Sequence, residues 1–343
     1  MTAQGILVGL VFYLMFPANI IGLWWAVGSP LLMDHNSICR KTRRLAGKQR
    51  EICKKEPEIV KEVAKGAELA ILECQHQFKA RRWNCTSHRR SIGKILKRDT
   101  REAAFVYAIT AAGVLHSVTN ACTQGSLMQC SCINDYRDTP PGADFAWGGC
   151  NDNVGYGYNK SKQFMDAMPK KRRGDIRTLI QLHNNEAGRL AVQMHMVKWC
   201  KCHGLSGSCS LKTCWKKMPQ FDTVGNRLKG GFDGAIKVIG SNDGEELLPF
   251  GDTIKPHMSK DLIYGEDSPN FCRAYRRAGS LGTSGRDCDP NSLGVGGCDI
   301  LCCGRGYRKY QQTLNENCHC VFKWCCEVKC DICTVTKTIY KCV

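Results

Sequence analysis

The sequence predicts an α+β fold rich in disulfides, with a helical amino-terminal domain and a small cystine-rich carboxy-terminal domain built on β-hairpins. Two observations carry this prediction. Apolar residues recur at helical spacing before residue 200, whereas short segments punctuated by glycine and paired cysteines follow residue 272. Cysteine accounts for 24 of the 343 residues, and none of them lies between Cys214 and Cys272. Such a dense, even set of cysteines is typical of proteins that fold in an oxidising compartment, so we expect export.

The amino terminus agrees with export. Residues 5–16 form a short apolar run, and Pro17 and small residues follow it, so we expect residues 1–22 to be a cleaved signal peptide. The run lacks a basic segment before it, since the first charged residue is Asp34. A retained membrane anchor is the alternative, because the uncharged stretch approaches spanning length. Pro17 and Asn19 interrupt that stretch, which favours cleavage.

Three helices are expected in the amino-terminal domain, which we assign to residues 23–215. Apolar residues repeat every three or four positions over residues 60–78, behind Pro57 at the first turn. Residues 103–115 are apolar on nearly every side, which is typical of a helix buried all round. A third run covers residues 176–194, with Asp175 as its expected N-cap.

The rest of the chain is expected to be a linker and a second domain. Residues 216–271 contain no cysteine and hold many turn residues, including Gly230, Gly231 and Gly234, around one expected strand at 235–239. We therefore assign them to a linker. Residues 272–343 are assigned to the carboxy-terminal domain, with short strands expected at 320–324 and 334–340.

The chain is strongly basic, with 49 lysines and arginines against 31 acidic residues and a net charge of +18. This balance favours a polyanionic partner. Export excludes nucleic acid as that partner, which leaves sulfated glycans such as heparan sulfate and anionic surfaces. Basic residues cluster at 40–44, 170–173, 216–217 and 305–309. For each cluster, a solvated face without a partner is the alternative.

The densest motif is residues 200–214, CKCHGLSGSCSLKTC, in which four cysteines bracket a loop of small residues. Three interpretations are open, and the first is a zinc site. Its ligands would come from Cys200, Cys202, His203, Cys209 and Cys214. A Cys-x-Cys pair is tighter than the usual spacing of zinc ligands. The second is a hydrolase elbow at Ser206, but the motif Gly-x-Ser-x-Gly requires a second glycine where this chain has Ser208.

The third interpretation is a hairpin laced by nested disulfides, with glycines supplying the turn geometry. Its inner and outer pairs would be Cys202 with Cys209 and Cys200 with Cys214. Ser206 would then lie at the tip, where its hydroxyl is accessible to a modifying enzyme. A plain turn serine remains the alternative.

A second constellation covers residues 318–333, CHCVFKWCCEVKCDIC. Phe322 and Trp324 flank Lys323 there, next to the vicinal pair Cys325 and Cys326. Aromatic side chains on a stapled loop are good interface anchors. The alternative is that both rings pack inward and supplement a core too small to stand alone.

The motifs together resemble the Wnt family. The signature CKCHGLSGSC matches completely over residues 200–209, and further segments that resemble the family follow one another in the expected order: 81–85, 147–150, 183–189, 267–272 and 302–306. Residues 23–30 and 43–47 are similar to the sixth paralogue group of that family. The resemblance implies the Wnt-like two-domain fold and a secreted signalling ligand, not an enzyme.

The resemblance also implies a covalent modification and a set of partners. A membrane-bound O-acyltransferase would attach palmitoleate to Ser206, and no separate cofactor is expected. The hairpin tip with Leu205, Ser206 and Gly207 and the finger with residues 322–326 would bind a Frizzled cysteine-rich domain. An LDL-receptor-related co-receptor, a carrier for the acylated ligand and heparan sulfate complete the expected partners. The protein would reach the extracellular space and matrix through the endoplasmic reticulum. A basic cystine-rich matrix protein that binds heparan sulfate is the alternative.

Cysteine order in the family implies twelve disulfides. The amino-terminal pairs are Cys39–Cys53, Cys74–Cys85, Cys122–Cys130, Cys132–Cys150, Cys200–Cys214 and Cys202–Cys209. The carboxy-terminal pairs are Cys272–Cys303, Cys288–Cys298, Cys302–Cys342, Cys318–Cys333, Cys320–Cys330 and the vicinal pair Cys325–Cys326. Two N-glycosylation sequons occur, at Asn84 and Asn159.

Overall fold

The computed structural model describes residues 39, 47–86, 91–134, 145–167, 175–241, 244, 246–251, 256–275 and 279–343. The expected signal peptide, residues 1–22, lies outside the described residues. The basic clusters at 40–44 and 170–173 lie outside them as well.

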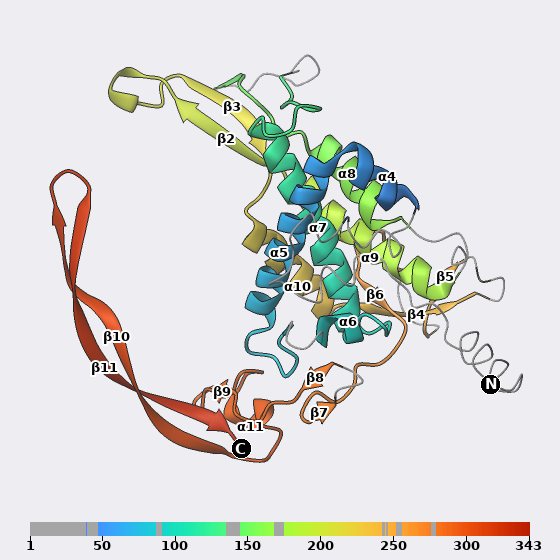
Figure 1. Ribbon diagram of the computed structural model, residues 1–343, viewed down its shortest axis with the longest axis vertical. Coiled ribbons are helices and arrows are strands. Elements are labelled where there is room, and N and C mark those ends of the chain that lie inside the picture. Colours follow the sequence, from blue (N-terminus) through green and yellow to red (C-terminus); the bar gives the residue numbers. More distant parts are fainter. Residues whose placement is uncertain are drawn as a thin grey trace, which may run out of the picture.

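A helical body surrounds one central helix, α7 (Arg101–Thr123) (Figure 1). Around it pack α5 (Pro57–Phe78), α8 (Val154–Met165), α9 (Ile176–Gln193) and α10 (Phe221–Asp233), while α4 (Gly47–Lys55) lies against α5 and α8, and the short α6 (Ser91–Ile95) precedes α7. Helix α7 is long and apolar enough to cross a membrane, but its neighbours bury most of it. It is therefore the core helix of the body, as its all-round apolar sequence predicts.

The three expected helices are confirmed, and local chemistry explains their first turns. Pro57 occupies the first turn of α5, where its missing N–H leaves no hydrogen bond unmade. The Thr100 side chain caps α7 by accepting from the backbone N–H of Ala103 at 3.4 Å. Asp175 caps α9 as predicted, since its carboxylate accepts from the backbone N–H of Arg177 at 3.4 Å.

An aromatic cluster forms part of the core at the end of α5. The Phe78 ring at the end of α5 lies edge-on to Trp83, Phe105 and Phe232, with centroids 4.9, 4.8 and 4.9 Å away. Such edge-to-face pairs add about 0.5–1.5 kcal/mol each beyond the area they bury. Phe232 belongs to α10, so this cluster holds α10 against α5 and α7.

The prediction of a linker over residues 216–271 is therefore wrong for much of that segment. Phe221, Val224, Leu228 and Phe232 are buried along one face of α10 and belong to the main core. Their spacing is helical, but three glycines near them obscured the pattern. The expected strand is present as β4 (Ile236–Gly240), which pairs with β5 (Leu247–Pro249) and β6 (Ile263–Tyr264).

The carboxy-terminal part consists of short elements and one long hairpin. The short elements are β7 (Ala274–Tyr275), β8 (Ser280–Leu281), β9 (Asp287–Cys288) and α11 (Cys298–Leu301). Strands β10 (Tyr307–Lys323) and β11 (Glu327–Cys342) pair antiparallel and extend far from the body (Figure 1). At about 3.4 Å per residue, the 17 residues of β10 span roughly 55 Å. The strands expected at 320–324 and 334–340 lie within this hairpin.

Eleven disulfides join all the cysteines except Cys325 and Cys326, in the pairing that the family resemblance implies. In the carboxy-terminal part, Cys298, Cys302 and Cys342 themselves form the small core together with Leu301. Disulfides thus supply there the constraint that a larger apolar core supplies in the helical body.

Candidate functional site

A short hairpin projects from the helical body and carries the motif 200–214. Strands β2 (Val197–Cys202) and β3 (Lys212–Lys217) pair antiparallel, and the parallel strand β1 (Ala146–Trp147) lies on the other side of β3. We call residues 197–217 the thumb hairpin. The register places Cys200 directly opposite Cys214, so their disulfide clamps the stem. The second disulfide, between Cys202 and Cys209, closes the loop beyond it.

The tip of the thumb hairpin is a tight turn, η5 (Leu205–Gly207). The backbone N–H of Gly207 donates to the carbonyl of Gly204 at 3.0 Å, and that of Ser208 donates to Leu205 at 3.1 Å. Ser206 and Gly207 have φ of 55° and 77°, in the left-handed region that favours glycine. The Leu205 side chain is 93% exposed. The turn therefore presents Leu205 and Ser206 to solvent.

The three serines of this loop differ in their hydrogen bonding. The Ser208 and Ser210 hydroxyls bond to each other at 3.3 Å. Among the described residues, no group forms a hydrogen bond with the Ser206 hydroxyl, although it is exposed at the tip. Ser206 is thus the one of the three whose hydroxyl is not engaged with another described residue.

The structure separates the three interpretations of this motif. All four cysteines are bonded in pairs, so they supply no thiolate for zinc. Ser206 lies on an exposed turn between disulfide-linked strands, whereas a nucleophile elbow sits between a strand and a helix. The nested-disulfide hairpin is the interpretation that the structure bears out.

The long hairpin carries the second candidate site at its free end. We call residues 307–342 the finger hairpin. Phe322 pairs across the strands with Val328, and these side chains are 65% and 61% exposed. Trp324, in the turn, is 94% exposed. The alternative that Phe322 and Trp324 pack inward is wrong, because the described body contributes no surface that covers this end of the hairpin.

The vicinal disulfide expected between Cys325 and Cys326 is not formed in this structure. Both cysteines are free and exposed, and their sulfur atoms lie 3.5 Å apart. Both have positive φ, 69° and 86°, because they form the turn that joins β10 to β11. The turn of the finger hairpin thus brings the two thiols close together, and no covalent bond joins their sulfur atoms.

The two hairpins leave the helical body on the same side (Figure 1). The thumb hairpin extends from the end of the body near α7 and α8, while the finger hairpin starts at the carboxy-terminal unit and curves back toward the thumb. The two sites therefore face a shared space outside the body. Spacing along the sequence carried no signal for this arrangement, although the family resemblance implied that both tips contact one receptor domain.

The basic cluster at 216–217 was noted in the sequence, but the pairing of lysines with aromatic rings around the thumb stem was not. The Lys198 ammonium lies 4.1 Å from the centroid of the Phe145 ring, and that of Lys217 lies 5.4 Å from Trp199. The Lys216 ammonium lies 6.0 Å from the Trp147 ring. The alternation of lysine and aromatic residues at 198–199 and 215–217 was the available signal.

The two sequons lie in different surroundings. Asn159 is exposed on α8, but the hydroxyl of Ser161 in the same sequon is buried and donates to the carbonyl of Ala111 at 2.9 Å. Asn84 is half-buried beside Cys85, whose disulfide to Cys74 closes the loop after α5. Glycosylation at both remains a prediction.

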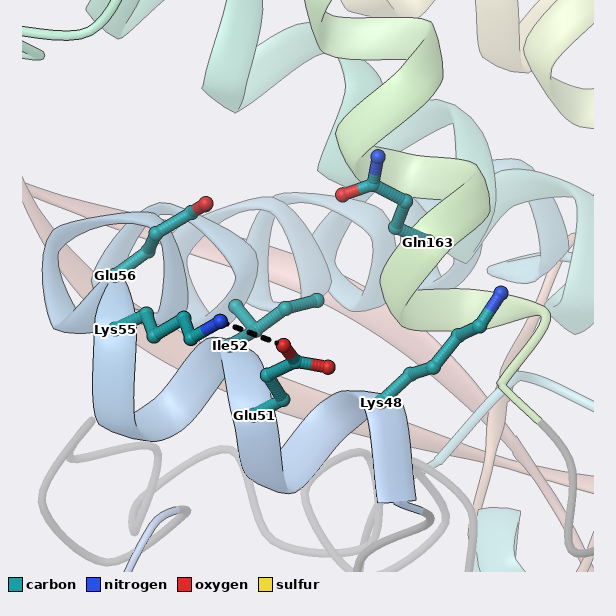
Figure 2. A pocket seen from close by; sticks show the side chains of 6 residues that line it. All are labelled: Lys48, Glu51, Ile52, Lys55, Glu56 and Gln163. Carbon is teal, nitrogen blue, oxygen red and sulfur yellow. Dashed lines mark hydrogen bonds and ion pairs between the residues drawn. The ribbon is translucent and has the colours of Figure 1, made fainter.

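A shallow pocket of about 330 Å³ lies away from both hairpins, between α4 and α8 (Figure 2). Its lining residues are Lys48, Glu51, Ile52, Lys55, Glu56 and Gln163. The Lys55 ammonium bonds to Glu51 at 2.8 Å (Figure 2). Glu56 is paired with Lys160 at 2.5 Å. These charges are already paired within the protein, and none of the predicted site residues lines the pocket.

Comparison with known proteins gives consistent results along the chain. Residues 41–343 match the model of the wnt family. Protein Wnt-6 of Mus musculus is 53% identical over 355 residues, covering 98% of this chain and 98% of the mouse protein. Protein Wnt-6 of Homo sapiens is 53% identical over 354 residues, covering 97% of each chain. Among solved structures, human WLS in complex with WNT8A matches with a TM-score of 0.61 and 37% identity, over 84% of this chain and 96% of that chain.

Proposed function

The chain belongs to the Wnt family, and from this premise we propose that it is a secreted, acylated ligand that activates Wnt signalling in development by binding two receptors. Palmitoleate on Ser206 and the tip of the finger hairpin bind the cysteine-rich domain of a Frizzled receptor. An LDL-receptor-related co-receptor binds elsewhere on the same molecule. The ligand itself catalyses no reaction.

The exposure of Ser206 is the observation that carries this proposal. An acyltransferase needs a hydroxyl that can reach its active site, and Ser206 lies on a protruding turn with no hydrogen bond to a described residue. The neighbouring Leu205, 93% exposed, adds apolar surface beside the attachment point. Roughly a dozen methylenes at about 0.8 kcal/mol each give an upper bound of about 10 kcal/mol when the receptor covers the chain. The acyl group therefore dominates the affinity.

The finger hairpin supplies the second contact. Phe322, Lys323, Trp324, Cys325 and Cys326 form its exposed end. Interfaces concentrate their binding energy in buried aromatic anchors, and Trp324 is the most exposed tryptophan side chain among the described residues. Because the two hairpins face a shared space, one receptor domain placed there contacts both tips.

The remaining partners follow from the chemistry of an acylated, basic ligand. An exposed acyl chain requires a carrier in the secretory pathway, and WLS, which forms a complex with WNT8A, is the candidate. Heparan sulfate in the extracellular matrix binds the exposed basic cluster 305–309 at the base of the finger. The co-receptor binds residues 216–271, in which Ile239 on β4, Leu248 on β5 and Phe250 just after β5 are exposed at the surface.

The test compares secreted wild-type protein with Ser206→Ala and with the matched control Ser208→Ala. Mass spectrometry of the tip peptide measures acylation, and binding to an immobilised Frizzled cysteine-rich domain measures affinity. We expect the acyl mass on wild type and on Ser208→Ala, and loss of both the adduct and receptor binding in Ser206→Ala. An unmodified Ser206 in protein that binds the receptor fully would overturn the proposal.

The alternative, a matrix protein that only binds glycans, rests on the net charge of +18. Cells that lack heparan sulfate separate the two functions. The proposed ligand still activates signalling in such cells when its receptors are present, whereas a glycan-binding matrix protein has no receptor-dependent activity.

A further inference from the structure

The thumb hairpin has an unusual charge distribution. Between Met194 and Phe221 the chain contains five lysines and no aspartate or glutamate. The lysines are Lys198, Lys201, Lys212, Lys216 and Lys217. This density of one charge on a projecting hairpin points to an anionic surface outside the molecule.

Four of these lysines have no acidic partner. The ammonium groups of Lys198, Lys201, Lys216 and Lys217 form no ion pair with any carboxylate in the described part of the chain. Lys198 and Lys216 are direct partners across the strands, so two like charges share one face of the stem. Lys201 and Lys217 lie on the opposite face. Like charges placed opposite each other destabilise a hairpin, and an anionic surface relieves that repulsion.

The exposed leucines and the lysines of the thumb hairpin occupy different depths along it. Leu205 and Leu211, near the tip, are 93% and 59% exposed. Trp199, in the stem, is 53% exposed. Behind the loop, Lys212 and Lys201 come first, Trp199 follows, and Lys198, Lys216 and Lys217 lie nearest the base. Exposed leucines at the end, with lysines and a tryptophan behind them, are the arrangement of a segment that dips into a membrane leaflet.

We propose that the thumb stem binds anionic lipid headgroups, so that its lysines and the acylated tip together hold the protein on a negatively charged membrane surface. The proposal rests on the acylation of Ser206 proposed above. A single acyl chain gives marginal, reversible membrane binding, and stable attachment takes a second signal such as a polybasic patch. The stem supplies that second signal next to the chain.

A sulfated glycan is the other anionic partner for these lysines. It offers nothing to the exposed side chains of Leu205 and Leu211, which a membrane buries. The position of the lysines behind an apolar tip therefore favours the membrane, and glycan binding becomes an outcome of the test.

The test uses full-length secreted protein and sedimentation with two kinds of vesicle, phosphatidylcholine alone and phosphatidylcholine with phosphatidylserine. The variant is Lys198→Gln combined with Lys201→Gln. The control, Lys61→Gln combined with Lys97→Gln, removes the same charge from exposed positions on the helical body. Each lysine at an anionic surface strengthens binding about fivefold. We expect the stem variant to lose up to about 25-fold on the phosphatidylserine vesicles and nothing on phosphatidylcholine, and the control to match wild type.

Two results would overturn the proposal. One is equal binding of the stem variant and wild type to the phosphatidylserine vesicles. The other is weakened binding of the stem variant to soluble heparin with unchanged binding to those vesicles, which would assign the stem to a glycan. Failure of the acylation proposal is recognised separately, because binding to phosphatidylcholine alone then vanishes for every protein. The ratio of binding to the two vesicle types still measures the contribution of the lysines to binding.

Discussion

Arg82 and Arg286 join the helical body to the carboxy-terminal part, because each donates hydrogen bonds to backbone carbonyls of the other part. The Arg286 guanidinium donates to the backbone carbonyls of Arg81 and Arg82 at 2.6 and 2.7 Å, and to that of Lys79 at 2.8 Å. Arg82 in turn donates from its own guanidinium to the carbonyl of Ile300 in α11, at 3.1 and 3.0 Å. The finger hairpin grows from the unit that contains Arg286 and α11. These bonds therefore fix where the finger stands relative to the thumb.

Arg286→Gln is expected to loosen this joint without unfolding either part. Hydrogen bonds from a charged donor contribute about 1.5–3 kcal/mol each, and glutamine cannot reach three carbonyls at once. We expect weaker receptor binding and faster protease cleavage after α5, with the disulfides unchanged. Arg308→Gln, an exposed change on β10, is the control. Unaltered cleavage and binding in Arg286→Gln would show that other contacts hold the joint.

Gly66 and Gly113 permit the close approach of α5 and α7. A β-carbon on either residue would overlap the carbonyl oxygen of the other. Gly113→Ala is expected to destabilise the protein by about 1–3 kcal/mol through overpacking, and to reduce secretion. Gly230→Ala on α10 is the matched control, because no heavy atom lies within 4 Å of its added β-carbon. That control is expected to gain about 0.5–1 kcal/mol, and thermal unfolding measures both.

The free energy of unfolding is expected to decrease on mild acidification, because two partly buried histidines have lowered pKa values in the folded protein. Burial lowers the pKa of His116 beside Phe221 and that of His183, where the carbonyl of Asp261 acts in the opposite direction. The unfolded chain takes up these protons at a higher pH than the folded chain. Stability is therefore complete above the unfolded pKa of about 6.5 and declines as pH falls below it.

Thermal unfolding at about pH 7.5 and about pH 5.5 measures this decline. His116→Phe removes one of the titrating groups and is expected to reduce the difference in unfolding free energy between the two conditions. Asn120→Gln, an exposed change on α7 that removes no titrating group, is the control and is expected to leave the difference unchanged. A pH dependence that is identical in all three proteins would contradict the assignment to His116.

Trp324→Ala is expected to weaken receptor binding strongly with no change in thermal stability. The side chain is 94% exposed in the free protein, so its removal leaves no cavity. Buried aromatic anchors contribute about 2 kcal/mol or more, which corresponds to about a 30-fold loss of affinity for the Frizzled domain. Ile332→Ala, 74% exposed and further from the tip, is the control. Equal losses in both variants would argue against an anchor at Trp324.

Several features were predictable from the sequence because they depend on neighbouring residues. The helices α5, α7 and α9 follow from apolar spacing and from Pro57 and Asp175 at their starts. The nested hairpin around Ser206 follows from cysteines and glycines within fifteen residues. Cysteine content indicated an oxidising compartment before any contact was known. Features of this kind depend on residues close together in the sequence, so contacts with distant segments do not alter them.

Other features depend on segments that meet only in the folded chain. The helical face of α10 was hidden because glycine suits a turn as well as an exposed helix position, and only its packing on Phe78 and Phe105 decided between them. The outward position of Trp324 followed from a hairpin too long for the body to cover. The joint between Arg82 and Arg286, 204 positions apart, has no local signal, yet it places the two hairpins on one side of the molecule. Local spacing thus determined the elements, and packing between distant segments decided which of their surfaces remain free to bind.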